Sequence, residues 1–176
     1  MYNPFLKRAF DIIISLTAII LLSVPMAVIA IAIRLTSPGP AFFKQKRLGK
    51  DKSTFYILKF RTMRLDAPTD LPSRELVDAE KWITPIGKFL RRTSIDELPQ
   101  LFNILIGQMS LVGPRPTVAA QEELVRERDR YGVYAVRPGL TGWAQINGRD
   151  ELEIDYKAKL DGEYVEKMSF AFDCKC

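Results

Sequence analysis

The feature that most constrains this chain is an uncharged apolar block near its N-terminus. Between Asp11 and Arg34 stand 22 residues without a charged side chain. As a straight helix, at about 1.5 Å per residue, this block reaches about 33 Å, close to the thickness of the hydrocarbon core of a bilayer. A chain with such a block is not a simple soluble globule.

The residues within and around the block leave two geometries open. Lys7 and Arg8 precede it and Arg34 follows it, and positive charge on both sides favours two cytoplasmic ends. Ser23 and Pro25 stand at its middle, where a proline removes a helical hydrogen bond and a serine hydroxyl can satisfy a freed carbonyl. The block is therefore interpreted either as a re-entrant helix that turns back at Ser23 and Pro25 or as a proline-kinked spanning helix.

The composition of the 176-residue chain limits its chemistry and its partners. The net charge of +5 favours phosphorylated substrates and anionic lipids, whereas the pattern of basic residues does not fit a helix that binds nucleic acid. The chain contains no histidine, which leaves Asp, Glu, Lys, Arg and Tyr for catalysis. Cys174 and Cys176 are too close for a disulfide framework, and this indicates a reducing compartment.

A β-hairpin is predicted directly after the block. Residues 42–48 and 54–60 are rich in aromatic and β-branched side chains and enclose a turn at 49–52. The surrounding segment holds one acid, Asp51, and eight basic residues: Lys44, Lys46, Arg47, Lys50, Lys52, Lys59, Arg61 and Arg64. Such a juxtamembrane cluster is typical of contact with anionic lipid headgroups, and the alternative is a solvated strand face.

The segment 91–100 contains an acidic pair. Asp96 and Glu97 are adjacent, so their side chains point in different directions on a helix, and Pro99 makes the preceding turn irregular. One carboxylate can act as a nucleophile on phosphorus while its neighbour holds a cation, a covalent route that needs no histidine. The competing interpretation is a capping box, in which Ser94 and Glu97 only cap the start of a helix.

Arginines and glycines supply further candidate binding groups. Arg91 and Arg92 stand close enough to the acidic pair in sequence to neutralise phosphate oxygens. Arg115 lies between two prolines in a stiff loop that suits a bidentate phosphate clamp, although a turn with a surface arginine gives the same pattern. The segment 137–149 combines three glycines, which allow a ligand close to the backbone, with the stacking face of Trp143.

Taken together, four stretches resemble the bacterial sugar transferases, the monotopic phosphoglycosyl transferases that start glycan assembly on polyprenol phosphate. They are KRAFDIIIS (7–15), FYILKFRTM (55–63), TSIDELPQLFNILIGQMSLVGPRP (93–116) and VRPGLTGWAQINGR (136–149). With the apolar block, they run in the order of the family and cover nearly the whole chain. Such a set is far more specific than any single motif.

The resemblance implies a helix-rich α+β fold in a monotopic membrane protein. Residues 1–36 would form a re-entrant helix–break–helix, and residues 37–176 a small cytosolic catalytic domain with a short β-hairpin and interfacial amphipathic helices. The implied location is the cytosolic face of the bacterial inner membrane. The chain departs from the family pattern in two places: Val24 separates Ser23 from Pro25, and the sequence stops at Cys176 where relatives commonly continue.

The resemblance also implies a reaction. Asp96 would be the nucleophile and Glu97 the Mg²⁺ ligand. A nucleotide diphosphate sugar, usually a UDP-sugar, would give its sugar 1-phosphate to polyprenol phosphate through a phosphosugar–aspartate intermediate, with release of UMP. This is the first membrane step in the assembly of an exopolysaccharide, capsule, O-antigen or glycoprotein glycan, and its product would pass to downstream glycosyltransferases. The candidate substrate- and phosphate-binding residues are Lys59, Arg61, Arg91, Arg92, Arg115, Arg137, Thr141, Trp143, Gln145 and Arg149.

Two other functions are weighed against this reaction. A non-catalytic scaffold could use the polybasic hairpin to bind anionic lipids. A CDP-alcohol phosphotransferase is disfavoured, because that class has several spanning helices and a cluster of aspartates.

Overall fold

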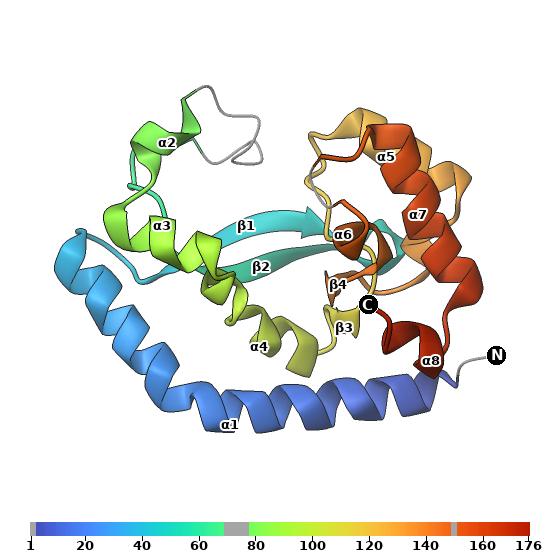
Figure 1. Cartoon of the computed structure of the whole chain (residues 1–176), viewed down its shortest axis with the longest axis horizontal. Coiled ribbons are helices and arrows are strands. Elements are labelled where there is room, and N and C mark those ends of the chain that lie inside the picture. Colours follow the sequence, from blue (N-terminus) through green and yellow to red (C-terminus); the bar gives the residue numbers. More distant parts are fainter. Residues whose placement is uncertain (1–2, 69–77, 149–150) are drawn as a thin grey trace.

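The apolar block forms most of one long helix, α1 (Pro4–Thr36), in a computed structural model that describes residues 3–68, 78–148 and 151–176. The Asn3 side chain caps the first turn by accepting a hydrogen bond from the Phe5 N–H at 2.9 Å, and Pro4 takes a position that needs no donor. The helix continues through Ser23 and Pro25, and the Ser23 hydroxyl donates to the Ile20 carbonyl at 2.8 Å. Figure 1 shows α1 curving beneath the rest of the molecule without an interruption.

The remaining elements follow in a mixed order. They are β1 (Phe42–Leu48), η1 (Lys50–Lys52), β2 (Thr54–Phe60), α2 (Ala79–Trp82), α3 (Pro85–Arg92), η3 (Ile95–Glu97), α4 (Gln100–Leu105), β3 (Ser110–Val112), α5 (Glu122–Arg130), η4 (Val133–Ala135), β4 (Gly139–Thr141), α6 (Trp143–Ile146), α7 (Ile154–Lys167) and α8 (Phe170–Asp173). The expected helix-rich α+β fold is confirmed.

Strands β1 and β2 form the predicted antiparallel hairpin with the predicted bounds. Phe55 and Ile57 alternate with exposed residues on β2, and they are buried against α4 and the middle of α1. The end of β2 contributes Phe60 to a second core, with Met26 and Ile33 of α1 and Leu90 of α3. The hairpin therefore rests on α1 through two apolar clusters.

A second sheet was not predicted. Its strands β3 and β4 are parallel and only three residues long, too short to show a period in the sequence. They approach so closely that a Cβ atom on Gly139 would stand 2.1 Å from the backbone nitrogen of Gly113. The glycine at 139 is therefore required by contact between two backbones.

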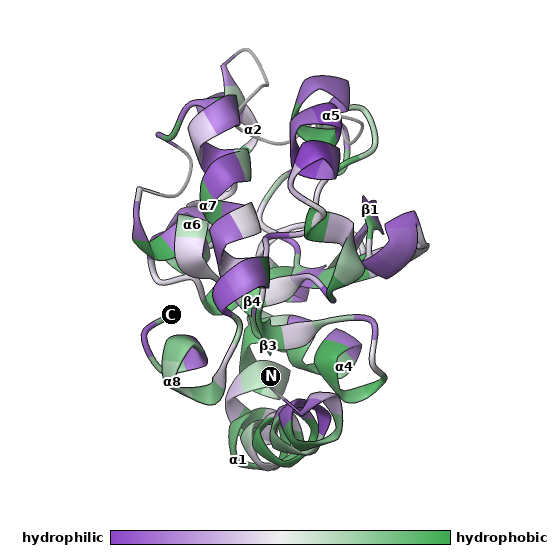
Figure 2. Ribbon diagram, turned by 90° about the vertical axis from the view of Figure 1, so that its right-hand side faces the viewer, coloured by the Kyte–Doolittle hydropathy of each residue, from purple (hydrophilic) through white to green (hydrophobic). Residues whose placement is uncertain are grey.

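Hydrophobic side chains gather at one end of the molecule. Figure 2 shows α1 and α4 mostly in hydrophobic colours at one end, and α2 and α5 mostly in hydrophilic colours at the other. Large apolar residues are exposed on several short helices as well as on α1, among them Phe89 of α3, Phe102 of α4 and Phe170 of α8. Within the described residues, α1 is the one helix long and apolar enough to cross a membrane by length and composition.

Polar contacts attach the N-terminal end of α1 to the rest of the fold. Lys7 pairs with Asp173 at 2.6 Å. The Arg8 guanidinium donates to the carbonyls of Ile104 and Leu105 at 2.6 and 2.7 Å, which satisfies the last turn of α4. The buried Asp11 carboxylate accepts from the Ser110 hydroxyl at 3.0 Å and from the Leu111 N–H at 2.9 Å. The KRAFD sequence thus joins α1 to α4, β3 and α8.

Replacing Asp11 with alanine should destabilise the fold. The Leu111 N–H and the Ser110 hydroxyl would lose their acceptor, and the expected loss is about 1–3 kcal/mol in the free energy of unfolding. Thermal and denaturant unfolding in detergent measure it. In the control Asp129→Ala, which removes an exposed ion pair with Lys52, the loss should stay below about 1 kcal/mol. Equal losses in the two variants would contradict the assignment.

Candidate active site

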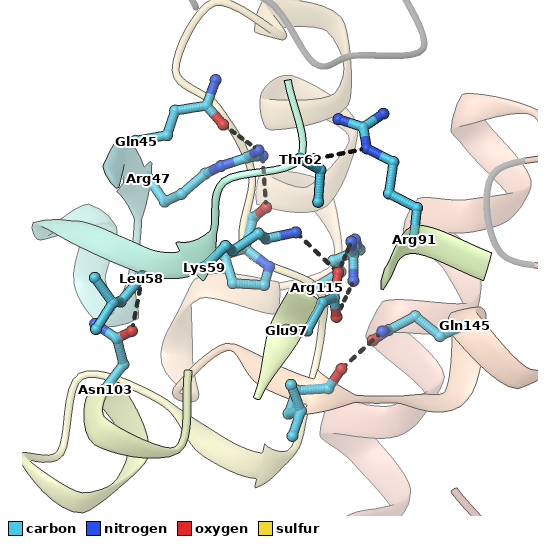
Figure 3. A network of polar contacts seen from close by, with 12 residues as sticks. Gln45, Arg47, Leu58, Lys59, Thr62, Arg91, Glu97, Asn103, Arg115 and Gln145 are labelled. Atoms are coloured by element: carbon cyan, nitrogen blue, oxygen red, sulfur yellow. Dashed lines mark hydrogen bonds and ion pairs between the residues drawn. The ribbon is translucent and has the colours of Figure 1, made fainter. Parts of the chain in front are cut away.

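Three segments that are distant in sequence meet at the Glu97 carboxylate. The Lys59 ammonium, from β2, donates to Oε1 at 2.8 Å. The Arg115 guanidinium, from the loop after β3, donates to Oε1 at 2.6 Å and to Oε2 at 3.3 Å. Figure 3 shows these three side chains converging. Two cations predicted from the sequence, Lys59 and Arg115, therefore bind one of the two predicted catalytic acids, Glu97.

The turn that carries the acidic pair has an irregular backbone. Ser94 adopts a left-handed conformation with φ of 56°, which turns the chain sharply from α3 into η3. Ile95 and Leu98 enclose the acidic pair and pack against the core that contains Met26 and Ile33 of α1. The pair is thereby fixed between the long helix and the hairpin.

The capping interpretation of Ser94 and Glu97 is not supported. The Ser94 side chain makes no capping hydrogen bond at the start of η3. The Glu97 carboxylate, which a capping box would direct back to the Ser94 N–H, binds Lys59 and Arg115. Glu97 therefore belongs to a network that spans three segments.

The two adjacent carboxylates have opposite electrostatic environments. Burial disfavours the charged form of Glu97, but the charges and hydrogen bonds of Arg115 and Lys59 outweigh burial and hold its pKa well below the ordinary value. Burial raises the pKa of Asp96 above its ordinary value, although Lys59 and Arg91 oppose this shift. Among the described residues, no hydrogen bond to the Asp96 carboxylate is found. Asp96 is thus the less stabilised anion of the pair.

A cavity of about 480 Å³ opens beside the acidic pair. Asp96 and Glu97 are the only acids among its described lining residues. Its cations are Arg47, Lys59, Arg61, Arg64, Arg91, Arg115, Arg128 and Lys157. A cavity with this balance of charge is suited to a ligand that carries several negative charges.

The predicted phosphate-binding arginines occupy different places. Arg91 lines the cavity, and its Nε donates to the Thr62 hydroxyl at 2.8 Å (Figure 3). This contact is possible because α3 lies at Gly87 against the residues that follow β2, where a Cβ atom would stand 2.0 Å from the Thr62 carbonyl oxygen. Arg92 is exposed on α3 and lies outside the cavity lining.

Two further arginines from the prediction bind backbone carbonyls. Arg61 is buried and donates to the carbonyls of Ser37, at 2.7 Å, and Pro38, just after the end of α1. Arg137 is exposed and donates to the Gly107 carbonyl at 2.8 Å. Arg61 thus attaches the C-terminal end of α1 to the segment that directly follows β2.

The glycine-rich segment does not line the cavity within the described residues. Thr141 donates to the Cys176 carbonyl at 2.9 Å, and Trp143 donates to Glu163 at 3.0 Å. Gln145 donates to the Leu140 carbonyl at 2.9 Å. Arg149 lies outside the described residues. The described part of this segment packs against other parts of the protein.

Sequence reasoning missed two buried cations of the cavity, Arg128 and Lys157. A signal was available for Arg128. It follows Leu124 by four residues on α5, so the two share one helix face, and both are buried. A charged residue on the apolar face of a helix needs a buried partner, so this spacing predicts a buried ion pair at Arg128.

The acidic pair is a chemically suitable place for a divalent cation. No group of three or more His, Cys, Asp or Glu side chains is gathered within the described residues. Mg²⁺ is commonly held by one or two carboxylates together with substrate phosphates, so a smaller set suffices. A carboxylate has about four lone-pair sites, and Lys59 and Arg115 leave room on Oε2 of Glu97.

Comparison with known proteins places the chain in a family. The sequence profile described as bacterial sugar transferase matches residues 2–176. The UDP-glucose:undecaprenyl-phosphate glucose-1-phosphate transferase of Escherichia coli (strain K12) is 42% identical over 180 residues, which cover 98% of this chain and 39% of that protein. By their names, several relatives are phosphosugar transferases. The chain belongs to the bacterial sugar transferase family.

Two other relatives show the range of lengths. The exopolysaccharide production protein PSS of Rhizobium leguminosarum bv. phaseoli is 42% identical over 182 residues, covering 97% of this chain and 90% of that protein. The UDP-N-acetylgalactosamine-undecaprenyl-phosphate N-acetylgalactosaminephosphotransferase of Aeromonas hydrophila is 39% identical over 177 residues, covering 96% of this chain and 41% of that protein. The chain spans about two fifths of the Escherichia coli and Aeromonas relatives and most of the Rhizobium relative.

Proposed function

We propose that this protein transfers a sugar 1-phosphate from a UDP-sugar to polyprenol phosphate through a covalent intermediate on Asp96. The observation that carries the proposal is the unequal pair: Asp96 is buried without a hydrogen-bonding partner among the described residues, whereas Glu97 is fixed by two cations. The names of the relatives supply the donor and acceptor, because they include UDP-glucose and undecaprenyl phosphate.

In the first step, a carboxylate oxygen of Asp96 attacks the β-phosphorus of the donor. A bond forms between this oxygen and phosphorus, and the bond from phosphorus to the oxygen that bridges the two phosphates breaks. UMP leaves with that electron pair, and the sugar phosphate stays on Asp96. Arg115, Lys59 and Arg91 line the cavity where negative charge develops, and fixed cations in such a place stabilise the transition state.

In the second step, an oxygen of polyprenol phosphate attacks the same phosphorus. The bond between phosphorus and Asp96 breaks, the carboxylate is restored, and the sugar leaves on polyprenyl diphosphate. Packing supports an approach from the lipid side, since Ile95 and Leu98 on either side of the acidic pair contact the core shared with α1. The product would be the substrate of downstream glycosyltransferases.

Mg²⁺ fits this site as a cofactor shared between Glu97 and the donor. Glu97 would hold the ion, since its Oε2 accepts only one hydrogen bond among the described contacts, at 3.3 Å. When bound, Mg²⁺ neutralises charge on the phosphates and makes UMP a better leaving group. Lys59 and Arg115 keep the Glu97 carboxylate ionised and oriented.

We also propose that α1 enters and leaves the membrane from the cytosolic face of the inner membrane. Both ends of α1 are attached to the same domain: Arg8 binds carbonyls at the end of α4, and Arg61, directly after β2, binds the carbonyls of Ser37 and Pro38. A domain on one side cannot hold both ends of a helix that spans the bilayer. The exposed apolar residues of α3, α4 and α8 would lie at the interface, and exposed basic residues of the hairpin would contact anionic lipids.

Asp96→Asn should abolish turnover. An amide is a poor nucleophile, so UMP release from UDP-glucose or UDP-N-acetylgalactosamine in the presence of polyprenol phosphate should fall by more than about 100-fold. Intact-protein mass spectrometry of the wild type with donor alone should show an added sugar phosphate that the variant lacks. Near-normal turnover of the variant would exclude Asp96 as nucleophile. A wild type that binds anionic vesicles and releases no UMP would support the scaffold.

Glu97→Gln should weaken the dependence on Mg²⁺. The neutral amide is a poorer ligand for a hard cation, so the Mg²⁺ concentration that gives half-maximal UMP release should rise several-fold, and the maximal rate should fall. A titration of Mg²⁺ against initial rate, with circular dichroism as a check on folding, measures both effects. An unchanged titration curve would show that Glu97 does not hold the metal.

Labelling of Asn3→Cys tests the topology. In a background with serine at positions 174 and 176, this cysteine should react with a membrane-impermeant maleimide only from the side of the globular domain. A variant that keeps the exposed Cys174 marks that side. Adding Ser23→Ala and Pro25→Ala restores a helical hydrogen bond and should shift part of the population to a spanning helix, with labelling of position 3 from the periplasm. Periplasmic labelling without these changes would establish a spanning helix.

A further inference from the structure

The loop that presents Arg115 is held by other parts of the protein. Its four carbonyls from Pro114 to Thr117 each accept a hydrogen bond from a different donor. The donors are the Gly139 N–H to Pro114 at 2.9 Å, Arg128 Nη1 to Arg115 at 2.8 Å, Arg47 Nη1 to Pro116 at 3.1 Å and the Leu48 N–H to Thr117 at 2.9 Å. The two prolines have no N–H to donate, so external donors set the path of this loop.

Arg128 is the donor that acts on Arg115 itself. Its Nη1 donates to the Arg115 carbonyl and also to the Thr117 hydroxyl, so one guanidinium holds the chain on both sides of Pro116. The Arg128 side chain is 3% exposed. Because Arg128 is fixed on α5, the position of this helix determines where Arg128 holds the loop.

Asp161 of α7 fixes the orientation of Arg128. Its Oδ2 accepts from Arg128 Nε at 2.9 Å and from Nη2 at 2.6 Å, and the Asp161 side chain is 2% exposed. Both contacts engage one edge of the guanidinium, which leaves Nη1 directed at the loop. Asp161 does not line the cavity, so it has no direct route to a substrate.

A buried ion pair of this kind is a weak source of stability. The cost of removing two charges from water offsets most of their attraction. A protein with apolar residues of similar volume in place of such a pair is often equally stable. The pair in this protein has a specific geometric consequence instead. It determines where the Arg115 backbone lies, and the Arg115 side chain reaches Glu97 from there at 2.6 Å.

We propose that Asp161 and Arg128 are positioning residues for Arg115, which they hold in reach of Glu97 and of the donor phosphates. This inference rests on the proposed function and deepens it. The sequence of contacts runs from α7 through α5 to the loop and ends in the cavity. Because charge stabilisation of a transition state depends on placement within about 1 Å, a shift of the loop should slow the reaction.

A double-mutant cycle tests the inference. Asp161→Asn leaves Arg128 without its charge partner and beside Lys157, which lies one turn earlier on α7. The expected result is a fall in kcat/KM for UMP release of about tenfold or more. Arg115→Ala should lower kcat/KM by itself, and adding Asp161→Asn to it should change the rate by less than about twofold, because the group being positioned is already gone.

Arg128→Lys provides a second route to the same answer. Lysine keeps a cation beside Asp161 but cannot donate to Asp161 and to the Arg115 carbonyl with the same geometry. It should therefore fold even if Asp161→Asn does not. Alone it should lower kcat/KM, and added to Arg115→Ala it should change kcat/KM by less than about twofold. Glu127→Gln is the matched control, since it removes an exposed ion pair with Arg130 on the same helix and should leave kcat/KM unchanged.

The possible outcomes separate this inference from the proposed function. Multiplicative effects of Asp161→Asn and Arg115→Ala, or a fully active Asp161→Asn, would overturn the positioning role while the wild type still releases UMP. A wild type that releases no UMP from any UDP-sugar would overturn the proposed function together with this inference. Thermal unfolding of every variant shows which losses of rate accompany a loss of folded protein.

Discussion

The pairing of the Glu97 carboxylate with Lys59 and Arg115 is the interaction on which the rest of the site depends. A buried carboxylate is unfavourable without a cation, so the fold must bring β2 and the loop after β3 to the same turn. Once these segments meet, they form the cationic cavity wall. The same contact leaves the adjacent Asp96 without a comparable partner among the described residues, and this separates the properties of two neighbouring acids.

The long helix α1 has two roles that a separate membrane anchor would not have. Much of its surface is apolar and exposed, yet Met26 and Ile33 form part of the core that supports the turn with the acidic pair. Its polar contacts lie at its ends, where Arg8 and Asp11 bind one side of the domain and the chain after Thr36 binds Arg61. This arrangement gives the proposed reaction a physical setting, because a lipid phosphate and a soluble nucleotide would meet directly beside the helix.

The basic residues after α1 form one cluster in the sequence but have different structural roles. The sequence groups Arg47, Lys59 and Arg61 into a juxtamembrane cluster, and the structure gives each of them a different internal partner. Arg47 binds the Pro116 carbonyl, Lys59 binds Glu97, and Arg61 binds the end of α1. Arg47 and Lys59 lie on the same face of the hairpin, since Arg47 pairs with Phe55 and Phe43 pairs with Lys59. Charge and strand alternation alone therefore could not assign these partners.

The sequence by itself determined the elements whose signals are local. The apolar block and the hairpin at 42–60 follow from a hydrophobic run and from alternation within a few residues, and the structure confirms them. The four matched stretches were enough to identify the family, and the family model confirms it. Only the tertiary structure decided the pairing of β3 with β4, the burial of Arg128 against Asp161 and the different positions of the predicted arginines. These depend on contacts between segments far apart in the chain, where three-residue strands and single charged side chains leave no periodic signal.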